Sequence, residues 1–296
     1  MKRGILVYNP TAGQRDLRAA MSALIDRQRR RGLELVNAPT SAPGDATAIV
    51  KSFLPRGLDL VAVCGGDGTV SEAACGLGGS DVPIAVLPGG TSNVLARELG
   101  IPTDLASAEA LLLDGVPRVL RPGHADGRLF LLWVGVGIDA RVMGQMNLAW
   151  KRRLGRIAIM PTAYSQFFRY EFPRLEVAID GTVHEATYAV VSRVRHYAGH
   201  WIIAPEARPD SETLEVMIFN HRSLGKFFKL FREMKAGRAG HLANGLAYIA
   251  RGRDVSIRTL DGDPVEVHVD GDCLMTTPIT CRVGADTVRV LVPKPG

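Results

Sequence analysis

The sequence of 296 residues has little of what marks secreted, zinc-binding or membrane-spanning chains. Its four cysteines form no C-x-x-C pair and no zinc-like spacing, so we expect reduced thiols and a cytoplasmic protein. The longest apolar run, Leu129 to Ile138, is about half of what a bilayer crossing requires. Asn9-Pro10 comes before any signal-peptide core is complete. We therefore expect any membrane contact to be peripheral.

Several catalytic motifs are also missing. No G-x-x-x-x-G-K-[ST] occurs, which excludes a Walker-type nucleotide hydrolase. The stretch Gly135-Val-Gly137-Ile-Asp139-Ala140 lacks the third glycine of a dinucleotide-binding fingerprint, so it gives no support to NAD binding of that type. Neither H-E-x-x-H nor G-x-S-x-G is present, which leaves zinc-protease and α/β-hydrolase chemistry unsupported.

Composition and charge are ordinary for a globular protein, with 46% hydrophobic and 22% charged residues. The formal net charge of +6 is a mild excess of cations. It favours anionic partners such as nucleotides, phospholipid head groups or nucleic acid, without choosing among them. No nucleic-acid-binding motif accompanies the charge, so we expect no nucleic-acid partner.

The first half of the chain alternates short β-rich runs with helical stretches, which indicates βαβ units around a parallel sheet. Right-handed crossovers would gather the loops that follow the strands on one edge of that sheet. The expected strands are Ile5–Tyr8, Leu33–Val36, Leu58–Cys64 and Pro83–Leu87. The expected helices are Gln14–Arg31, Gly44–Leu54, one that starts near Val70, and Val94–Leu99.

After about Arg121, strand-like runs follow one another, separated by turn signals such as Asp180-Gly181 and Asp261-Gly262. This pattern predicts a mainly antiparallel β domain, interrupted by helical segments near 151–169 and 223–242. The strand-like runs are Leu129–Val136, Leu175–Ile179, Thr187–Val194, Leu214–Phe219, Val255–Arg258, Val265–Val269 and Val288–Val292.

The change of pattern predicts two domains with a cleft between them. We expect a nucleotide-binding α/β domain over residues 1–121 and a β-rich lipid-substrate domain over residues 122–289. The last residues, about 290–296, are expected to pack back on the first domain.

The strongest local signal is the loop Gly65-Gly66-Asp67-Gly68-Thr69, which follows an expected strand and precedes a helix. Glycines let the backbone approach a ligand closely and adopt positive φ, and a helix N-terminus offers N–H groups to phosphate. Asp67 would repel phosphate directly. It fits beside a phosphate-bound Mg²⁺, or as an acceptor for hydroxyls and backbone amides. A plain glycine-rich turn with a capping aspartate is the structural alternative.

Two further loops repeat this pattern. Pro88-Gly89-Gly90-Thr91-Ser92-Asn93 follows another expected strand, and Asn9-Pro10-Thr11-Ala12-Gly13 follows the first one. Polar, glycine-bearing loops after three strands of a parallel sheet would meet at one edge. Their convergence predicts a nucleotide site.

In this order, the motifs resemble the diacylglycerol kinase catalytic-domain family, which includes bacterial lipid kinases and sphingosine kinases. The resemblance rests on the three loops together with Glu72, Ala96 and Arg97, and it spans nearly the whole chain. The G-G-D-G sequence alone also occurs in NAD kinases and phosphofructokinases. The segments of the second half that carry the resemblance are Gly135–Ala140, Tyr197–Gly199, Ala204-Pro205 and Asp270-Gly271-Asp272.

The resemblance implies an α/β plus β fold: an N-terminal α/β domain with a parallel sheet, like that of NAD kinase and phosphofructokinase, and a C-terminal, mainly antiparallel β-sandwich. It also implies a lipid kinase that transfers the γ-phosphate of ATP to a lipid hydroxyl, with Mg²⁺ as cofactor. A carboxylate would take the hydroxyl proton, while Mg²⁺ and backbone amides spread the developing charge.

The resemblance further implies which residues form the site. We expect Asp272 as the favoured base, Asp270 as the second choice, and Asp67 as a further catalytic residue. The expected nucleotide-binding residues are Asn9, Pro10, Thr11, Ala12, Gly13, Thr40, Gly65, Gly66, Asp67, Gly68, Thr69, Val70, Ser71, Glu72, Gly90, Thr91 and Asn93.

Two positions depart from the family pattern. The Asp-Gly-Glu of the family reads Asp270-Gly271-Asp272 here, so the last carboxylate is one methylene shorter. A misplacement near 1 Å can cost ~10²-fold in rate. An Asp-Gly turn between two strands is the structural alternative for this tripeptide. Many bacterial members also carry an Asp-Gly pair that holds a structural Mg²⁺; it aligns with Ser211-Glu212, leaving Asp210 or Glu212 as substitute ligands.

A soluble enzyme with a lipid substrate must touch a bilayer. Ser223 to Leu242 places apolar side chains at helical spacing with basic residues nearby, which suits either an anionic membrane surface or packing on the β domain. The cluster Lys151-Arg152-Arg153 with Arg156 is open to the same two interpretations. The apolar residues of the first segment are Leu224, Phe227, Phe228, Phe231 and Met234; the basic ones are Lys226, Lys229, Arg232, Lys235 and Arg238.

Two other functions stay open on the sequence. One is an NAD kinase-like enzyme, which phosphorylation of NAD would reveal. The other is a catalytically silent nucleotide- or lipid-binding protein of the same fold, which would bind ATP without turnover. The expected partners are ATP and a hydroxyl-bearing lipid, either diacylglycerol-like or sphingoid-like, and association into a homodimer stays open.

Overall fold

The computed structural model describes residues 2–12, 16–144, 166, 170–237, 242, 244–260 and 262–294, without the side chains of residues 143, 144 and 272–274. It divides into two compact units. Unit 1 comprises Met1–Leu120 with Ala285–Gly296, and unit 2 comprises Arg121–Gly284. Each unit is described by itself.

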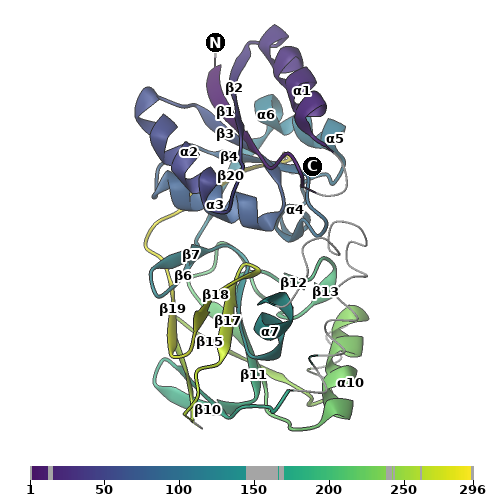
Figure 1. Cartoon of the computed structure of the whole chain (residues 1–296), viewed down its shortest axis with the longest axis vertical. Coiled ribbons are helices and arrows are strands. Elements are labelled where there is room, and N and C mark those ends of the chain that lie inside the picture. Colours follow the sequence, from purple (N-terminus) through teal and green to yellow (C-terminus); the bar gives the residue numbers. More distant parts are fainter. Residues whose placement is uncertain are drawn as a thin grey trace. The chain divides into compact units, whose positions relative to one another are not determined.

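Unit 1 is built on a six-stranded sheet in the order β2-β1-β3-β4-β20-β5 (Figure 1). The first five strands in this order run parallel, and β5 pairs antiparallel with β20. The expectation of an α/β domain with a parallel sheet is confirmed. The strands are β1 (Lys2–Tyr8), β2 (Leu33–Pro39), β3 (Leu60–Gly65), β4 (Ile84–Pro88), β5 (Val116–Leu120) and β20 (Val288–Val292).

The helices of unit 1 cover the sheet because each has one apolar face. Helix α1 buries Met21, Leu24 and Ile25, and α2 packs on α3. The first turn of α3 begins at Asp67, three residues before the expected start. Helix α1 begins at Arg18 rather than Gln14, and the Asp16 carboxylate accepts the Arg18 N–H there. The helices are α1 (Arg18–Arg30), α2 (Asp45–Phe53), α3 (Asp67–Leu77), α4 (Val94–Glu98), α5 (Leu105–Glu109) and α6 (Leu111–Asp114), with a 3₁₀ turn at Leu54–Arg56.

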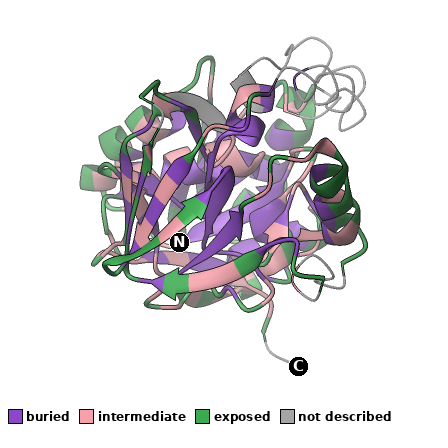
Figure 2. Cartoon of the chain, turned by 90° about the horizontal axis from the view of Figure 1, so that it is seen from below, coloured by how far each residue is buried: buried purple, intermediate pink, exposed green. Residues whose placement is uncertain are grey.

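Unit 2 consists of two six-stranded antiparallel sheets, ordered β10-β9-β16-β19-β6-β7 and β15-β14-β11-β8-β17-β18. Alternate side chains of both sheets form one apolar core, which confirms the expected β-sandwich. Figure 2 shows the strands largely in purple, for buried, and the loops largely in green. The first sheet contains β6 (Gly123–Ala125), β7 (Arg128–Phe130), β9 (Leu175–Ile179), β10 (Thr182–Ala186), β16 (Asp254–Thr259) and β19 (Ile279–Val283).

The second sheet contains β8 (Trp133–Val136), β11 (Tyr188–Ser192), β14 (Leu214–Phe219), β15 (Tyr248–Gly252), β17 (Glu266–Val269) and β18 (Asp272–Thr276). Outside the sheets lie the short pair β12 (His196–Tyr197) and β13 (Trp201–Ile202), and the helices α7 (Ile138–Gly144) and α10 (Leu224–Lys235).

Three details of the expectation for unit 2 change, and a fourth lies outside the described residues. Leu129–Val136 is not one strand, because the chain bends at Leu131-Leu132 between β7 and β8. The helix expected over 223–242 ends at Lys235. The segment near 151–169 and its basic cluster lie outside the described residues, except Gln166. The run Val288–Val292 belongs to the sheet of unit 1. Among the described residues, no helix is long and apolar enough to cross a membrane.

Candidate functional site

The loops that carry the sequence motifs of unit 1 all follow the carboxyl ends of parallel strands. Tyr8 pairs with Cys64, and Gly65 pairs with Pro88, so β1, β3 and β4 end side by side. The N–H of Asn9 donates to the Cys64 carbonyl at 3.2 Å. The loop after β2 joins them, because the Thr40 N–H donates to the Tyr8 carbonyl at 2.8 Å. The structure thus brings the three predicted loops and Thr40 to one edge of the sheet.

The glycines of these loops allow the loops to touch one another. A Cβ added to Gly90 would lie 2.5 Å from the Cα of Gly66, which no real structure tolerates. The N–H of Gly89 also donates to the Gly65 carbonyl at 3.0 Å. Gly66 has φ of −85°, so its backbone conformation does not require glycine. In chain order, Asn9–Gly13 is the first loop, Gly65–Thr69 the second and Pro88–Asn93 the third. The backbones of the second and third loops therefore pack directly against each other.

Asp67 fixes the third loop from within the second. Its carboxylate oxygens accept the N–H groups of Val94 and Leu95, each at 3.0 Å, at the start of α4. A carboxylate at a helix N-terminus is favoured by the helix dipole. Burial raises the pKa of Asp67 above its ordinary value, and the hydrogen bonds from Leu95 and Val94 oppose that shift. Of the roles expected for this aspartate, the observed one is that of an acceptor for backbone amides.

Other predicted site residues also stabilise the backbone. Asn93 has φ of 46°; its side-chain oxygen accepts the Gly90 N–H at 3.0 Å, and its amide donates back to the Gly90 carbonyl. The Glu72 carboxylate accepts the N–H groups of Gly44 and Ala46 at the start of α2, at 2.9 and 3.3 Å. The hydrogen bonds of Glu72 are those of a helix cap, and its expected role in nucleotide binding stays a prediction.

The remaining predicted residues differ in burial and in the contacts that the structure gives them. The Asn9 side chain accepts both the N–H and the hydroxyl of Thr11, each at 3.0 Å, which forms a tight turn after β1. Gly13 lies outside the described residues. Buried behind the loops are Pro10, Val70 and Ser71; partly or fully exposed are Thr11, Ala12, Gly68, Thr69 and Thr91.

The N-terminus of helix α3 lies at this edge of the sheet. Its N-cap residue is Gly66, and no side chain of the residues that the structure describes caps it. The first N–H groups of such a helix lack partners within the helix and carry a partial positive charge. They are suited to phosphate oxygens. The edge therefore combines glycine-bearing loops, hydroxyl side chains and an uncapped helix start.

The Asp270-Gly271-Asp272 motif of unit 2 is a two-residue hairpin turn between β17 and β18. Asp270 and Gly271 have φ of 50° and 97°, as a type I′ turn requires. The Asp270 carboxylate accepts three consecutive N–H groups, at 2.8, 2.9 and 3.0 Å, which belong to Leu131, Leu132 and Trp133. These contacts explain the bend between β7 and β8 and tie it to the turn.

Asp272 is the first residue of β18, and its backbone pairs with Val269 across the hairpin. Its side chain lies outside what the structure describes. Asp270 is committed to three amides, and Asp272 is placed by its backbone alone.

Sequence reasoning missed a buried polar network next to this turn. His268 and Asp139 are almost fully buried, and His268 Nε2 lies 2.9 Å from Asp139 Oδ2. The hydroxyls of Tyr188 and Tyr197 donate to the same oxygen at 3.3 and 3.0 Å. His268 Nδ1 accepts the Gly271 N–H at 3.3 Å, so the histidine proton is on Nε2.

One signal in the sequence pointed to this network. Gly135 lies in the glycine-bearing stretch before Asp139, and a Cβ there would collide with both Asp139 Oδ2 and His268 Nε2. The glycine therefore makes room for a buried pair and not for a nucleotide. No pattern in the sequence links His268 to it.

The structural Mg²⁺ implied by the family resemblance does not fit the residues at Ser211-Glu212. The Ser211 hydroxyl bonds to the Thr213 hydroxyl at 3.1 Å, and the Glu212 carboxylate pairs with Arg253 and Arg121. Hard cations prefer several oxygen ligands that are not already paired with cations. Among the described residues, no group of three or more His, Cys, Asp or Glu side chains could hold a metal ion.

Comparisons with known proteins agree with this layout. The family model of the diacylglycerol kinase catalytic domain matches residues 3–125, and that of the YegS C-terminal NAD kinase beta sandwich-like domain matches residues 133–292. A Bacillus subtilis protein named diacylglycerol kinase is 26% identical over 92% of this chain and 90% of its own length. One from Mycobacterium tuberculosis, with the same name, is 28% identical over 97% and 94%.

The fold is also found among solved structures. The crystal structure of a diacylglycerol kinase from Bacillus anthracis superposes with a TM-score of 0.74, at 23% identity, over 98% of this chain and 97% of that one. This likeness concerns the fold. The two family models together span both units, and the named relatives match nearly end to end. The chain therefore belongs to the lipid kinase family that joins a diacylglycerol kinase catalytic domain to a YegS-type β-sandwich.

Proposed function

We propose that this protein transfers the γ-phosphate of ATP to the hydroxyl of a lipid. The observation that carries the proposal is the meeting of the three glycine-bearing loops at the carboxyl ends of β1, β3 and β4, beside the uncapped start of α3. Such an edge suits the phosphates of a nucleotide. The relatives are named diacylglycerol kinase, and this name supports a lipid as the acceptor.

In this proposal, the loops of unit 1 bind ATP and hold its phosphates still. Backbone N–H groups of the Gly65–Thr69 loop and the hydroxyls of Thr40 and Thr91 contact the nucleotide. Asp67 positions the third loop through Val94 and Leu95. Mg²⁺ bound together with ATP would supply positive charge beside the phosphates. Each Asp67 oxygen has a second lone pair beyond its amide bond, which makes this carboxylate our candidate for contact with that ion.

For the proton acceptor we propose Asp272 over Asp270. The Asp270 carboxylate already accepts three backbone N–H groups, so its oxygens are engaged in holding the bend between β7 and β8. Asp272 follows directly in the same turn and has the chemistry required. Its proposed role is to take the proton of the lipid hydroxyl as the oxygen attacks the γ-phosphorus and ADP leaves.

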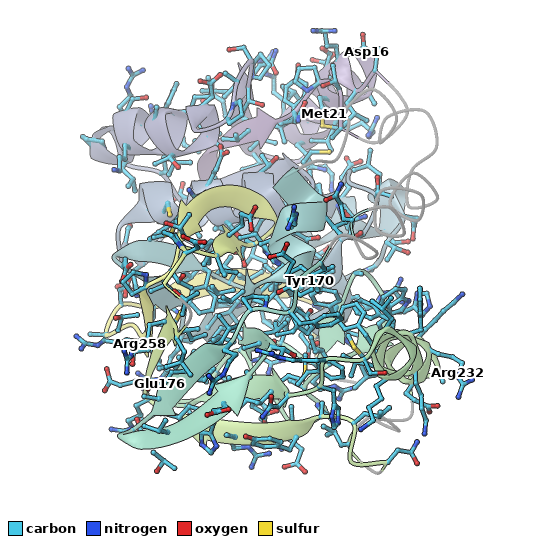
Figure 3. All side chains as sticks on the ribbon, turned by 60° about the horizontal axis from the view of Figure 1, so that its bottom comes forward. Asp16, Met21, Tyr170, Glu176, Arg232 and Arg258 are labelled. Atoms are coloured by element: carbon cyan, nitrogen blue, oxygen red, sulfur yellow. The ribbon has the colours of Figure 1, made fainter. Side chains whose placement is uncertain are left out.

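We also propose that α10 meets the membrane that contains the lipid. Phe227 packs inward, with its ring 5.6 Å from that of Phe219 and 5.8 Å from that of Tyr188, so the aromatic stripe is largely part of unit 2. Phe228, the next residue of the helix, is 46% exposed. Exposed basic residues flank it, and Figure 3 shows Arg232 pointing away from the helix on its outer side. Basic side chains beside an exposed aromatic ring suit anionic lipid head groups.

The first test uses purified full-length protein, Mg²⁺, γ-labelled ATP and a panel of hydroxyl lipids in mixed micelles, with NAD as a separate acceptor. Label in a lipid is the expected outcome and names the substrate class. Label in NAD alone would overturn the lipid assignment. ATP binding, measured by calorimetry, without label in any acceptor would indicate a silent binder.

The membrane contact has its own test. Phe228→Ser is compared with Val183→Ser, because Val183 is an apolar residue on β10 in the same unit that is 58% exposed, against 46% for Phe228. We expect only the first substitution to weaken sedimentation with anionic phosphatidylglycerol vesicles. Equal binding of both variants would remove α10 from the proposal and leave the kinase assignment intact.

A further inference from the structure

Arg193 is a charged side chain in the core of unit 2 to which the proposed reaction gives no role. It follows β11 directly and is 1% exposed. Its guanidinium donates four hydrogen bonds, all to backbone carbonyls. Nε bonds to Arg121 at 3.0 Å, Nη1 to Thr213 at 2.6 Å, and Nη2 to Pro209 at 3.1 Å and Ser211 at 2.7 Å.

Three of these carbonyls belong to one short segment, residues 209–213. Alternate carbonyls of this segment point at the same place. The Pro209 carbonyl also accepts the Arg121 N–H at 2.8 Å, so the carbonyls of Ser211 and Thr213 are the ones that most need a cation or donor there. A set of converging backbone oxygens is a common environment for a hard metal ion. Here a guanidinium with its fixed fork of donors satisfies them.

Charge and burial agree with this arrangement. Desolvation lowers the pKa of Arg193 to about 10, and the nearby negative charge of Asp210 counteracts that shift. The side chain therefore stays protonated near neutral pH. Burying a cation is costly unless its hydrogen bonds are made, and four of the five guanidinium N–H groups have partners.

The anchored segment is connected to the Asp270 turn through a single residue. The backbone N–H of Arg193 donates to the Leu132 carbonyl at 2.8 Å. The N–H of the same Leu132 donates to the Asp270 carboxylate at 2.9 Å. A shift of Arg193 would therefore move the strand connection on which the turn rests.

We propose that Arg193 is a built-in cation, which organises the 209–213 segment and makes a bound divalent ion unnecessary there. Arg193 is thus a positioning residue for the Asp270 turn. Only this last link rests on the proposed kinase function. The anchoring itself can be tested without any assay of activity, so the two ideas can fail separately.

The experiment is thermal unfolding of the full-length protein after treatment with EDTA, without nucleotide, with and without added Mg²⁺ or Ca²⁺. We compare wild type, Arg193→Met, Arg193→Lys and the double variant Arg193→Asn with Ser211→Asp. Arg258→Met is the matched control, because Arg258 is an exposed arginine on β16 whose guanidinium binds Glu176.

We expect the Tm of wild type to be unchanged by either ion. Arg193→Met should lower Tm by roughly 5 °C or more, because four backbone carbonyls lose a hydrogen bond from the guanidinium, while Arg258→Met should change it by about 1 °C or less. Arg193→Lys should lie between wild type and Arg193→Met, since it keeps the charge with fewer donors. The double variant should gain stability when an ion is added.

The wild-type measurement decides the matter even if a variant fails to fold. A saturable rise in its Tm with Mg²⁺ or Ca²⁺ that Ser211→Ala abolishes would overturn the proposal, because the segment would then hold a metal. An Arg193→Met protein as stable as wild type would overturn it as well.

Discussion

Asp67 and Asp270 lie in different units, yet each follows a strand and directs its carboxylate to the backbone of a distant segment. Asp67 accepts two N–H groups at the start of a helix, 27 and 28 residues further along the chain. Asp270 accepts three at the bend between two strands, 137 to 139 residues earlier. One carboxylate holds a loop of a parallel sheet, and the other holds a turn of an antiparallel one.

The comparison separates two uses of an aspartate in a glycine-bearing loop. In unit 1 the neighbouring glycines allow two loops to touch, and Asp67 ties them together. In unit 2 the neighbouring glycine supplies the positive φ of a hairpin, and Asp270 ties the hairpin to the strand connection beside it. Neither aspartate is a free carboxylate waiting for substrate. In the proposed reaction, that role is left to Asp272.

The largest effect is expected from Asp272→Asn, which tests the division of labour within the turn. We expect kcat to fall by about 10²- to 10⁴-fold, because a general base is lost, with little change in Tm. Asp270→Asn should instead lower the free energy of unfolding by about 1–3 kcal/mol, since one side-chain oxygen is replaced by a donor. Lipid-kinase kinetics and thermal unfolding measure the two quantities.

Asp263→Asn is the control for both, because Asp263 is an exposed carboxylate just before β17. If Asp270→Asn abolished turnover at unchanged Tm, the comparison would break, and Asp270 would be the base.

The next effect concerns the loops of unit 1. Asp67→Ala removes the acceptor of two amide hydrogen bonds and should destabilise the protein by about 2–5 kcal/mol. ATP affinity, measured by calorimetry below the unfolding temperature, should fall with it. Glu109→Gln, at a carboxylate of α5 that binds Arg27 and Gln28, is a control for general loss of stability in unit 1. If the control variant lost ATP affinity equally, Asp67 would have no special part in holding the loops.

A smaller effect is expected from the contact between the loops. Gly90→Ala should cost about 1–3 kcal/mol of unfolding free energy, because its Cβ meets the Gly66 backbone. Gly68→Ala is the matched control: the added Cβ meets nothing within 4 Å, and alanine is the better helix former. Chemical denaturation of both variants gives the difference. Equal stability would mean that the loops do not need their close approach.

The smallest effect is a dependence on pH that distinguishes burial from hydrogen bonding at Asp67. Its pKa is raised in the folded protein, so the folded state binds the proton more tightly than the unfolded one. The stability that Asp67 contributes is therefore present at low pH and lost as pH rises from the unfolded pKa near 4 through the raised value. Relative to Asp67→Asn, wild type should melt progressively lower across that range. The opposite slope would show that the two amide donors outweigh burial.

The sequence predicted the two-part fold because the spacing of apolar runs changes visibly along the chain. Strands separated by helices gave β1 to β4, and successive runs with Asp-Gly turns gave the sandwich. The sequence did not predict contacts between residues far apart in the chain. The partners of Asp67 and Asp270 depend on how the sheets pair, and no residue near either aspartate in the sequence indicates Leu95 or Leu132 as a partner. In a sequence, a buried arginine such as Arg193 cannot be told from an arginine on the surface. In the same way, His268 cannot be told from any other polar residue of a strand.

The place of β20 has a consequence for how the protein is made. This strand, residues 288–292, sits between β4 and β5 inside the sheet of unit 1, although all of unit 2 separates it from β5 in the chain. On the ribosome, the sheet of unit 1 stays incomplete until residues 288–292 have been synthesised, after all of unit 2. Unit 2 has every strand of its sandwich before then and can fold early. Truncation before Val288 should therefore leave unit 2 folded and the sheet of unit 1 incomplete.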